Sequence, residues 1–213
     1  FNRKNDISYD KYYFIKLFKR NKISHVINLA AYTDVDDCEK KKRICKKINV
    51  NFTKILCDAI SLTNPKIKLI HFSTDQMYSN YRTNIERNAK AINSYTRCKI
   101  ESEAIALKIN SIVIRTNFFG KSINKKRMSF LDWIYYSLKN KKKISLADDL
   151  FFSPISIKNL IKIVLKIMLT NKKGVYNIGS HNGFSKYHFG YLISKYTGMN
   201  IKYITKVKMK NLK

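Results

Sequence analysis

Three short and almost wholly apolar runs restrict this chain to one class of fold more strongly than any other feature. They cover residues 25–30, 67–72 and 111–115. A strand that is covered on both faces of a sheet is almost continuously apolar, as in parallel sheets. Between the first two runs, apolar residues recur at helical spacing, which predicts a helix with one buried face: Ile44, Ile48, Phe52, Ile55, Leu56 and Ala59. The strand-helix-strand order predicts an α/β fold with a doubly wound parallel sheet, whose ligands bind beyond the carboxyl ends of the strands.

Further patterns divide the chain into two parts. Periodic apolar residues predict four more helices and a short strand, over residues 8–20, 130–138, 157–168, 187–196 and 174–178. We expect residues 1–120 to form an NAD(P)-binding Rossmann domain that is incomplete at its start. Residues 121–213 are expected to form mainly a smaller C-terminal substrate-binding lobe, with 153–178 returning to the sheet.

The chain is strongly basic, with 43 lysine and arginine residues against 14 acidic ones and a formal net charge of +29. Such a charge is typical of proteins that bind nucleic acid or anionic membranes. The lysines are spread over nearly every segment, however, and runs such as 40–43 and 141–143 are typical of solvated helix ends and loops. We therefore predict no nucleic-acid partner and no membrane partner, and keep a nucleic-acid binder as the weakest alternative. The basic surface favours a diphosphate ligand.

The N-terminus lacks the pattern of a secretory signal, and no long apolar run appears, so we expect a cytoplasmic protein. The cysteines have neither the spacing of a metal pair nor that of a small disulfide framework, and we expect reduced, structural thiols at Cys38, Cys45, Cys57 and Cys98. The histidines form no cluster of ligands in the sequence. We predict no metal site.

One tyrosine and one lysine have the spacing of a proton-transfer pair. Tyr95 and Lys99 are four residues apart in a predicted helix whose N-cap we place at Ser94, so both lie on one face. A nearby ammonium favours the phenolate and lowers the pKa of a tyrosine, which lets the tyrosine transfer a proton near neutral pH. Thr74 and Asp75 follow the second apolar run and fall at the carboxyl edge of the sheet, where a bound carbonyl can accept a hydrogen bond. Alone, the pair also fits an ordinary surface contact, and Thr74 and Asp75 also fit a cap.

Several motifs in collinear order resemble the dTDP-4-dehydrorhamnose reductase family of extended short-chain dehydrogenases. They are Asn-Leu-Ala-Ala-Tyr-Thr-Asp-Val-Asp-Asp-Cys-Glu at 28–39, Ile-Asn-Val at 48–50, His-Phe-Ser-Thr-Asp-Gln-Met-Tyr at 71–78, Tyr-Thr-Arg-Cys-Lys at 95–99, Ile-Arg-Thr-Asn-Phe-Phe-Gly at 114–120 and Phe-Ser-Pro-Ile-Ser at 152–156. The resemblance extends over almost the whole chain. It implies reduction of the 4-keto group of a dTDP-4-keto-6-deoxy-hexose, with NADPH or NADH as the cofactor, in nucleotide-sugar biosynthesis for cell-surface polysaccharide.

The resemblance also implies the roles of individual residues. The catalytic set is Thr74, Tyr95 and Lys99, with Asp75 beside it. The cofactor-binding set is Asp6, Ile7, Ala30, Ala31, Tyr32, Asn49, Tyr95 and Lys99. The substrate-binding set is Thr33, Val35, Asn117, Phe118 and Ser153. Taken singly, Asp6 also fits the start of the helix over 8–20, and Phe118 fits a core position. A homodimer is compatible with the family.

One departure from the family concerns the phosphates of the cofactor. No glycine precedes Gly120, so the first half of the chain has no glycine-rich turn to bind a pyrophosphate. We therefore expect either a fragment of a longer product or a degenerate relative that binds the cofactor poorly. The alternatives that remain are a non-catalytic, sugar-nucleotide-binding or regulatory subunit, as in methionine adenosyltransferase, and another nucleotide-sugar epimerase or dehydratase.

Overall fold

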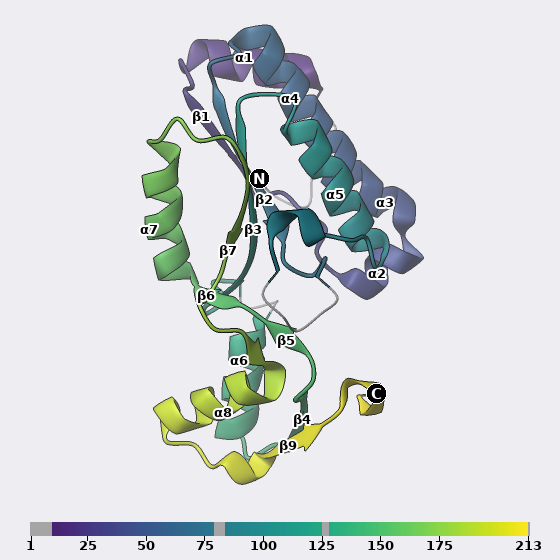
Figure 1. The fold of residues 1–213 in the computed structure, drawn as a ribbon, viewed down its shortest axis with the longest axis vertical. Coiled ribbons are helices and arrows are strands. Elements are labelled where there is room, and N and C mark those ends of the chain that lie inside the picture. The colour runs from purple at the N-terminus through teal and green to yellow at the C-terminus, as the bar shows by residue number, and fades with distance from the viewer. Residues whose placement is uncertain (1–9, 79–83, 125–127, 213) are drawn as a thin grey trace. The chain divides into compact units, whose positions relative to one another are not determined.

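The computed structural model describes residues 10–78, 84–124 and 128–212 (Figure 1). The chain divides into two compact units. The first unit comprises Phe1–Arg115 and Val164–Asn177, and the second comprises Thr116–Ile163 and Ile178–Lys213. The structural division thus falls close to residue 120, while the functional division into a cofactor part and a substrate part remains a prediction.

A parallel sheet forms the centre of the first unit. β1 (His25–Asn28) lies beside β2 (Lys68–Thr74), which lies beside β3 (Ser111–Phe119), and β7 (Gly174–Ile178) pairs with β3. β1 and β2 run parallel, with Val26 opposite Leu69. The predicted α/β fold with a parallel sheet is confirmed. β2 extends beyond its apolar run into Ser73 and Thr74 at its carboxyl end, which is where the predicted chemistry falls.

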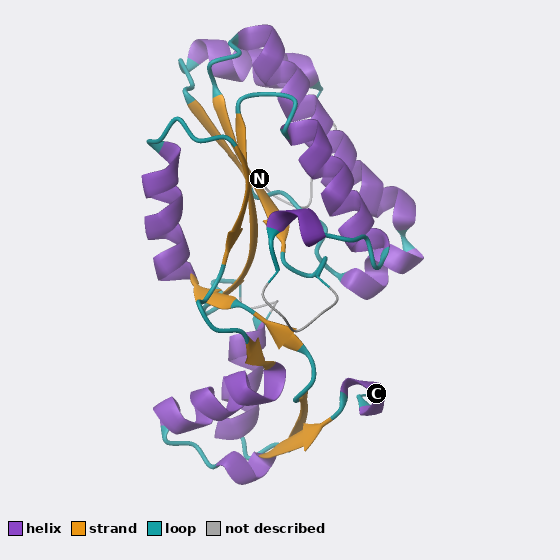
Figure 2. Ribbon diagram, in the orientation of Figure 1, coloured by secondary structure: helices purple, strands orange, loops and turns teal. Residues whose placement is uncertain are grey.

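Helices lie along both sides of this sheet, as Figure 2 shows. One side carries α1 (Lys11–Arg20), α2 (Val35–Lys40), α3 (Lys42–Lys46), α4 (Phe52–Thr63) and α5 (Ser94–Ala106), and α7 (Ile157–Met168) runs along the other. The core between α1, α4, α5 and the sheet is apolar and includes Phe14, Phe52, Ile60, Leu69 and Val113. Burial of these side chains stabilises the unit by about 1.5 to 3 kcal/mol for each large residue. Among the helices of the described residues, none is long and apolar enough to cross a membrane.

Two helix boundaries differ from those predicted. The helix predicted across 44–59 is interrupted by a π-helical segment, Lys47–Asn51, between α3 and α4. The N-cap of α5 is Asn93 and not Ser94, because the Asn93 side chain accepts from Thr96 N while the Thr96 hydroxyl binds the Asn93 backbone. This reciprocal capping satisfies two amide groups that the helix leaves without partners.

The second unit is built from short elements around its own core. α6 (Phe130–Lys139) and α8 (Lys186–Thr197) accompany β4 (Ile144–Ala147), β5 (Phe151–Phe152), β6 (Pro154–Ser156), β8 (Phe184–Ser185) and β9 (Ile204–Val207). β4 and β9 pair in parallel, β5 and β8 pair antiparallel, and β6 pairs in parallel with the end of β3. Single 3-10 turns complete the chain at Glu86–Asn88, Ile201–Tyr203 and Met209–Asn211.

A close approach of α8 to β4 fixes the core of the second unit. A Cβ atom on Gly190 would overlap Cδ1 of Leu146, so a larger residue there would require the Leu146 side chain to shift. Phe130 stacks on Phe189 at a centroid distance of 5.9 Å, and Phe152 packs edge-on against Phe189 at 5.3 Å. These aromatic contacts join α6, α8 and β5 around a single cluster.

Candidate active site

Two hydroxyl groups meet at the carboxyl end of β2. Thr74 is the last residue of β2 and Tyr95 lies in the first turn of α5, and the Thr74 side chain lies close enough to the phenol to lower its pKa. Both are buried, with exposed fractions of 4% and 6%. The sequence grouped these residues by their positions and by the family resemblance, and the structure brings them together.

The pKa of Tyr95 does not follow the sequence expectation. Burial raises it to about 12, and the Thr74 side chain, which lowers it, only partly opposes this effect. The charge of Asp75 raises it further. We expected Lys99 to lower the pKa of Tyr95, and this expectation is wrong for the present structure, because desolvation of the phenolate by burial is the largest influence on that pKa. Tyr95 therefore keeps its proton at neutral pH, as a proton donor must.

Lys99 is buried one turn along α5 from Tyr95. Its side chain is 1% exposed, and its Nζ donates a hydrogen bond to the backbone oxygen of Phe72 at 2.6 Å. Burial lowers the pKa of Lys99 to about 8, and the charge of Glu103 partly opposes that effect. Burial of a charged lysine costs folding free energy unless a charge partner offsets that cost. Buried lysines with a strongly shifted pKa are therefore often found at functional sites.

A tight turn after β2 fixes the direction of Thr74 and Asp75. The backbone N–H of Gln76 donates to Oγ1 of Thr74 at 3.2 Å, and that of Tyr78 donates to the backbone oxygen of Asp75 at 3.3 Å. Asp75 is half-buried, and its charge acts on Tyr95. The turn therefore holds a carboxylate and a hydroxyl beside the phenol.

Two asparagine side chains bind the backbone of the segment that we predicted to line the cofactor. Oδ1 of Asn28 accepts from the backbone N–H of Ala30 at 3.1 Å. Asn49, in the π-helical segment, binds both polar backbone groups of Tyr32: its Oδ1 accepts from Tyr32 N at 2.9 Å, and its Nδ2 donates to Tyr32 O at 3.1 Å. Ala31 lies between these two anchors and is half-buried. Asn49 thus positions Tyr32, and its direct contact with a cofactor remains a prediction.

The remaining predicted residues fall into three groups. Val35 and Tyr32 pack against the cluster that contains Tyr95, whereas the neighbouring Thr33 is exposed. In the second unit, Asn117 and Phe118 lie on β3 opposite Pro154 and Ile155 of β6, and Ser153 directly precedes that strand. Asp6 and Ile7 lie outside the described residues.

A thiol cluster surrounds one side of Tyr95. Cys38, Cys45 and Cys98 are buried, form no disulfide, and share an apolar cluster with the tyrosine. Burial raises the pKa of Cys98 to about 12, so this thiol stays protonated at neutral pH. Within residues 10–78, 84–124 and 128–212, no group of three or more histidine, cysteine or acidic side chains is arranged to hold a metal ion.

A cavity of about 1040 Å³ lies wholly within the second unit. Its wall is mainly apolar and includes Phe119, Leu131, Pro154, Phe189 and Leu192. Its lining includes the immediate neighbours of Phe118 and Ser153 but not those two residues themselves. Thr74, Tyr95 and Lys99 do not line this cavity.

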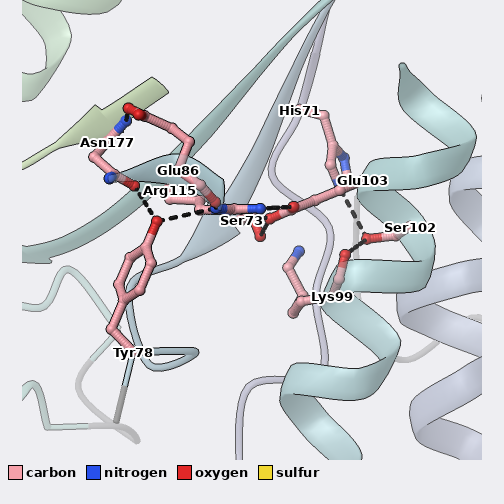
Figure 3. A network of polar contacts seen from close by, with 9 residues as sticks. All are labelled: His71, Ser73, Tyr78, Glu86, Lys99, Ser102, Glu103, Arg115 and Asn177. Carbon is pink, nitrogen blue, oxygen red and sulfur yellow. Dashed lines mark hydrogen bonds and ion pairs between the residues drawn. The ribbon is translucent and has the colours of Figure 1, made fainter. Parts of the chain in front are cut away.

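Sequence reasoning missed a buried polar network around Lys99, drawn in Figure 3. His71 lies between Asn28 and Ser102, at 3.1 Å from Nδ2 of Asn28 and 3.0 Å from the Ser102 hydroxyl, which in turn donates to the backbone oxygen of Lys99 at 2.8 Å. Burial lowers the pKa of His71 well below its usual value, and the charge of Lys99 acts in the same direction. A second branch joins Ser73, Glu103, Arg115 and Tyr78. Arg115 within an apolar strand was the signal in the sequence, because a buried arginine requires a partner.

The parallel sheet, the helices on both its sides and the hydroxyl pair at a strand end define a protein of the Rossmann-like α/β class. The family model of the RmlD substrate binding domain matches residues 3–212 of the chain. The chain belongs to this family, and the family predicted from the sequence motifs is confirmed.

Named relatives are similar to this chain over most of its length. A dTDP-4-dehydrorhamnose reductase of Aggregatibacter actinomycetemcomitans is 29% identical over 191 residues, covering 84% of this chain and 62% of the relative. A probable low-salt glycan biosynthesis reductase, Agl14, of Haloferax volcanii is 23% identical and covers 86% of this chain and 63% of the relative. The chain thus spans somewhat less than two thirds of the length of these relatives.

Solved structures show the same fold. The dTDP-4-dehydrorhamnose reductase of Bacillus anthracis, solved in complex with NADP, has a TM-score of 0.85 at 23% identity and covers 94% of this chain and 71% of its own. WbmG of Bordetella bronchiseptica, solved with NAD, has a TM-score of 0.74 at 22% identity and covers 89% of this chain and 61% of its own. At such identities the similarity establishes the fold.

Proposed function

We propose that this chain carries the proton-transfer site of an NAD(P)H-dependent reductase that converts the 4-keto group of a dTDP-4-keto-6-deoxy-hexose to a hydroxyl. Membership of the RmlD substrate binding domain family and the reductase relatives support the reaction class. The observation that carries the proposal is the buried placement of Thr74 beside Tyr95, with Lys99 one turn along the same helix. Such a set can bind a carbonyl oxygen and supply a proton to it.

Each of the three residues has a distinct task in this proposal. Tyr95 holds its proton at neutral pH and donates it to the sugar O4 as that oxygen gains negative charge. Thr74 donates its single hydroxyl proton in a hydrogen bond to the same carbonyl oxygen, so in the reacting state that proton is no longer directed at the phenol. Lys99 holds α5 against β2 through its hydrogen bond to the backbone oxygen of Phe72, and it supplies a positive charge near the reacting oxygen. A proton donor and a preorganised hydrogen-bond donor each contribute about a hundredfold or more to the rate of such reactions.

The residues present fit part of a nicotinamide dinucleotide. A bound reduced nicotinamide supplies the hydride in this chemistry. The small side chains of Ala30 and Ala31 leave the backbone accessible at the end of β1, and Lys99 has the donor groups to bind a ribose hydroxyl. No glycine precedes Gly120, so a glycine-rich cradle for the pyrophosphate is not found among the residues around β1.

The test of this function is product analysis with the intact protein. We expect incubation with NADPH and a dTDP-4-keto-6-deoxy-hexose to give a 6-deoxy-hexose with a hydroxyl at carbon 4, with one NADPH consumed for each product, as measured by NMR and by absorbance. Conversion to another keto sugar, or epimerisation without net NADPH consumption, would assign the site to a different nucleotide-sugar reaction. Tight binding of the sugar nucleotide without turnover would support a regulatory subunit.

A further inference from the structure

Three consecutive residues at the end of β2 each meet a residue on one face of α5. Thr74 lies beside Tyr95, the backbone oxygen of Phe72 accepts from Lys99 at 2.6 Å, and Ser73 donates to Oε1 of Glu103. Tyr95, Lys99 and Glu103 follow each other at intervals of four residues, so they form one stripe along the helix. Glu103 belongs to the same contact surface as the two residues already placed in the site.

Glu103 is a buried carboxylate that is held from two sides. It is 3% exposed, and besides Ser73 it binds Arg115 of β3, whose Nε lies 3.0 Å from Oε1 and whose Nη2 lies 2.5 Å from Oε2. Two parallel contacts to a guanidinium fix the plane of the carboxylate. Arg115 in turn donates to the Tyr78 hydroxyl at 2.9 Å and to the backbone oxygen of Glu86 at 2.6 Å. The orientation of Glu103 is therefore set by β2, β3 and the loop that follows Thr74.

The direction of the Lys99 side chain links it to this carboxylate. Figure 3 shows the Lys99 side chain with its ammonium group pointing toward the Ser73 and Glu103 side chains. Burial lowers the pKa of Lys99 to about 8, and the negative charge of Glu103 is the largest opposing influence, ahead of the thiols of Cys45 and Cys98. On β2, His71 faces Lys99 and is neutral at physiological pH because burial depresses its pKa. Of these groups, Glu103 is the one that also forms a two-point ion pair with a guanidinium, that of Arg115.

We propose that Glu103 is a positioning residue of this site: clamped by Ser73 and Arg115, it keeps the buried Lys99 ammonium charged and fixes α5 in register with the end of β2. Glu103 is buried and bound by Ser73 and Arg115, so it acts through Lys99 and through Ser73, which directly precedes Thr74. The inference deepens the proposed reductase function and rests on it for its biological meaning, but the charge relationship itself is independent of turnover.

The test follows the ionisation of Lys99 directly. In protein with isotope-labelled lysine, the Lys99 resonance, assigned by its loss in Lys99→Met, should titrate near pH 8. We expect Glu103→Gln to lower the midpoint by about one pH unit or more, since a nearby opposite charge shifts a buried group by that amount. The matched control is Glu101→Gln on the exposed part of α5, where Glu101 pairs with Lys46 at 3.3 Å, and it should leave the midpoint unchanged.

Loss of Glu103 alone leaves Arg115 buried without its charge partner, so a double variant accompanies the single one. If Glu103→Gln does not fold, the double variant Glu103→Gln/Arg115→Gln removes both charges, and replacing a buried pair together is commonly tolerated. We expect the Lys99 midpoint to fall in the double variant as well. A midpoint equal to that of the wild type in a folded Glu103 variant would overturn the inference.

The same variants separate this inference from the reductase proposal. If the intact protein reduces the keto sugar, Glu103→Gln should move the alkaline limb of its pH profile to lower pH, an effect that a purely structural residue would not have. If the protein shows no keto reduction but the Lys99 midpoint still falls, the proposed function fails and the positioning role of Glu103 stands. If the protein reduces the keto sugar but Glu103→Gln changes neither its pH profile nor the Lys99 midpoint, the reductase proposal stands and the role of Glu103 is contradicted.

Discussion

The hydroxyl of Thr74 lies beside the hydroxyl of Tyr95 across the junction between β2 and α5, and both side chains are buried. Twenty-one positions separate them in the sequence, so the contact depends on the fold and not on local chain geometry. A donor and an acceptor fixed in this way need little reorganisation when a carbonyl oxygen binds between them. The contact therefore links the parallel sheet to the proposed chemistry.

Removal of the Thr74 hydroxyl should impair keto reduction more than binding. We expect Thr74→Val in the intact protein to lower kcat by about a hundredfold, because one preorganised hydrogen-bond donor to the developing oxyanion is lost while the side-chain volume is kept. Steady-state kinetics check this, with Thr74→Ser as the control that restores a hydroxyl. A similar loss in Thr74→Ser would show that the methyl group and not the hydroxyl matters.

The depressed pKa of Lys99 predicts how stability changes with pH. The folded protein releases this proton near pH 8 while the unfolded chain keeps it to about pH 10.5, so the unfolded state binds more protons in that window. The contribution of Lys99 to the free energy of unfolding should therefore rise as the pH increases from 8 to 10.5, by a few kcal/mol in total.

Denaturation of the wild type and of Lys99→Met at several pH values measures this contribution as a difference. The comparison removes the opposing effect of buried thiols, whose raised pKa values make the folded state lose stability at alkaline pH. A difference between the two proteins that stays constant from pH 7 to pH 10 would contradict burial of a titrating lysine.

Asn49 should matter for stability because it satisfies two backbone groups of Tyr32. Asn49→Ala leaves the N–H and the carbonyl of Tyr32 without these partners, and each such loss in a buried place costs about 1 to 3 kcal/mol. Urea denaturation of Asn49→Ala tests the prediction. The control is Asn51→Ala, because Asn51 is an exposed asparagine in the same π-helical segment. Equal destabilisation of the two variants would rule out a special role for the Tyr32 contacts.

The composition before Gly120 predicts weak cofactor binding by the 213-residue chain itself. Without a glycine-rich turn, the backbone N–H groups that bind a pyrophosphate are missing, and we expect no measurable NADPH binding in calorimetry. Micromolar affinity would refute this argument and would show that the lysines or the ends of β1 and β2 replace the turn.

The parallel sheet could be predicted because three continuous apolar runs and one amphipathic helix leave few other arrangements. The pairing of β4 with β9 could not, since each strand has four residues and about sixty residues lie between them, so no local pattern marks the partner. The π-helical segment was also missed, because its apolar spacing differs little from that of an α-helix. Short strands and local helix distortions are set by tertiary packing.

The groups that we propose as reacting groups could be singled out from the sequence, whereas the residues that support them could not. Tyr95 and Lys99 were found by spacing and resemblance, whereas Glu103 was overlooked although it continues the same stripe of α5. Its role depends on Arg115 and Ser73, which meet it only in the folded chain. The direction of the Tyr95 pKa was also mistaken, since spacing reveals a nearby cation but not the extent of burial.

The most direct test of the central claim is the rate of keto reduction by Tyr95→Phe in the intact protein. Loss of the phenolic proton should abolish reduction, by a thousandfold or more in order of magnitude, while binding of the sugar nucleotide in calorimetry stays within about threefold of the wild type. The same substitution at the exposed Tyr12 of α1 should change neither quantity. Undiminished turnover in Tyr95→Phe would contradict the assignment of Tyr95 as the proton donor.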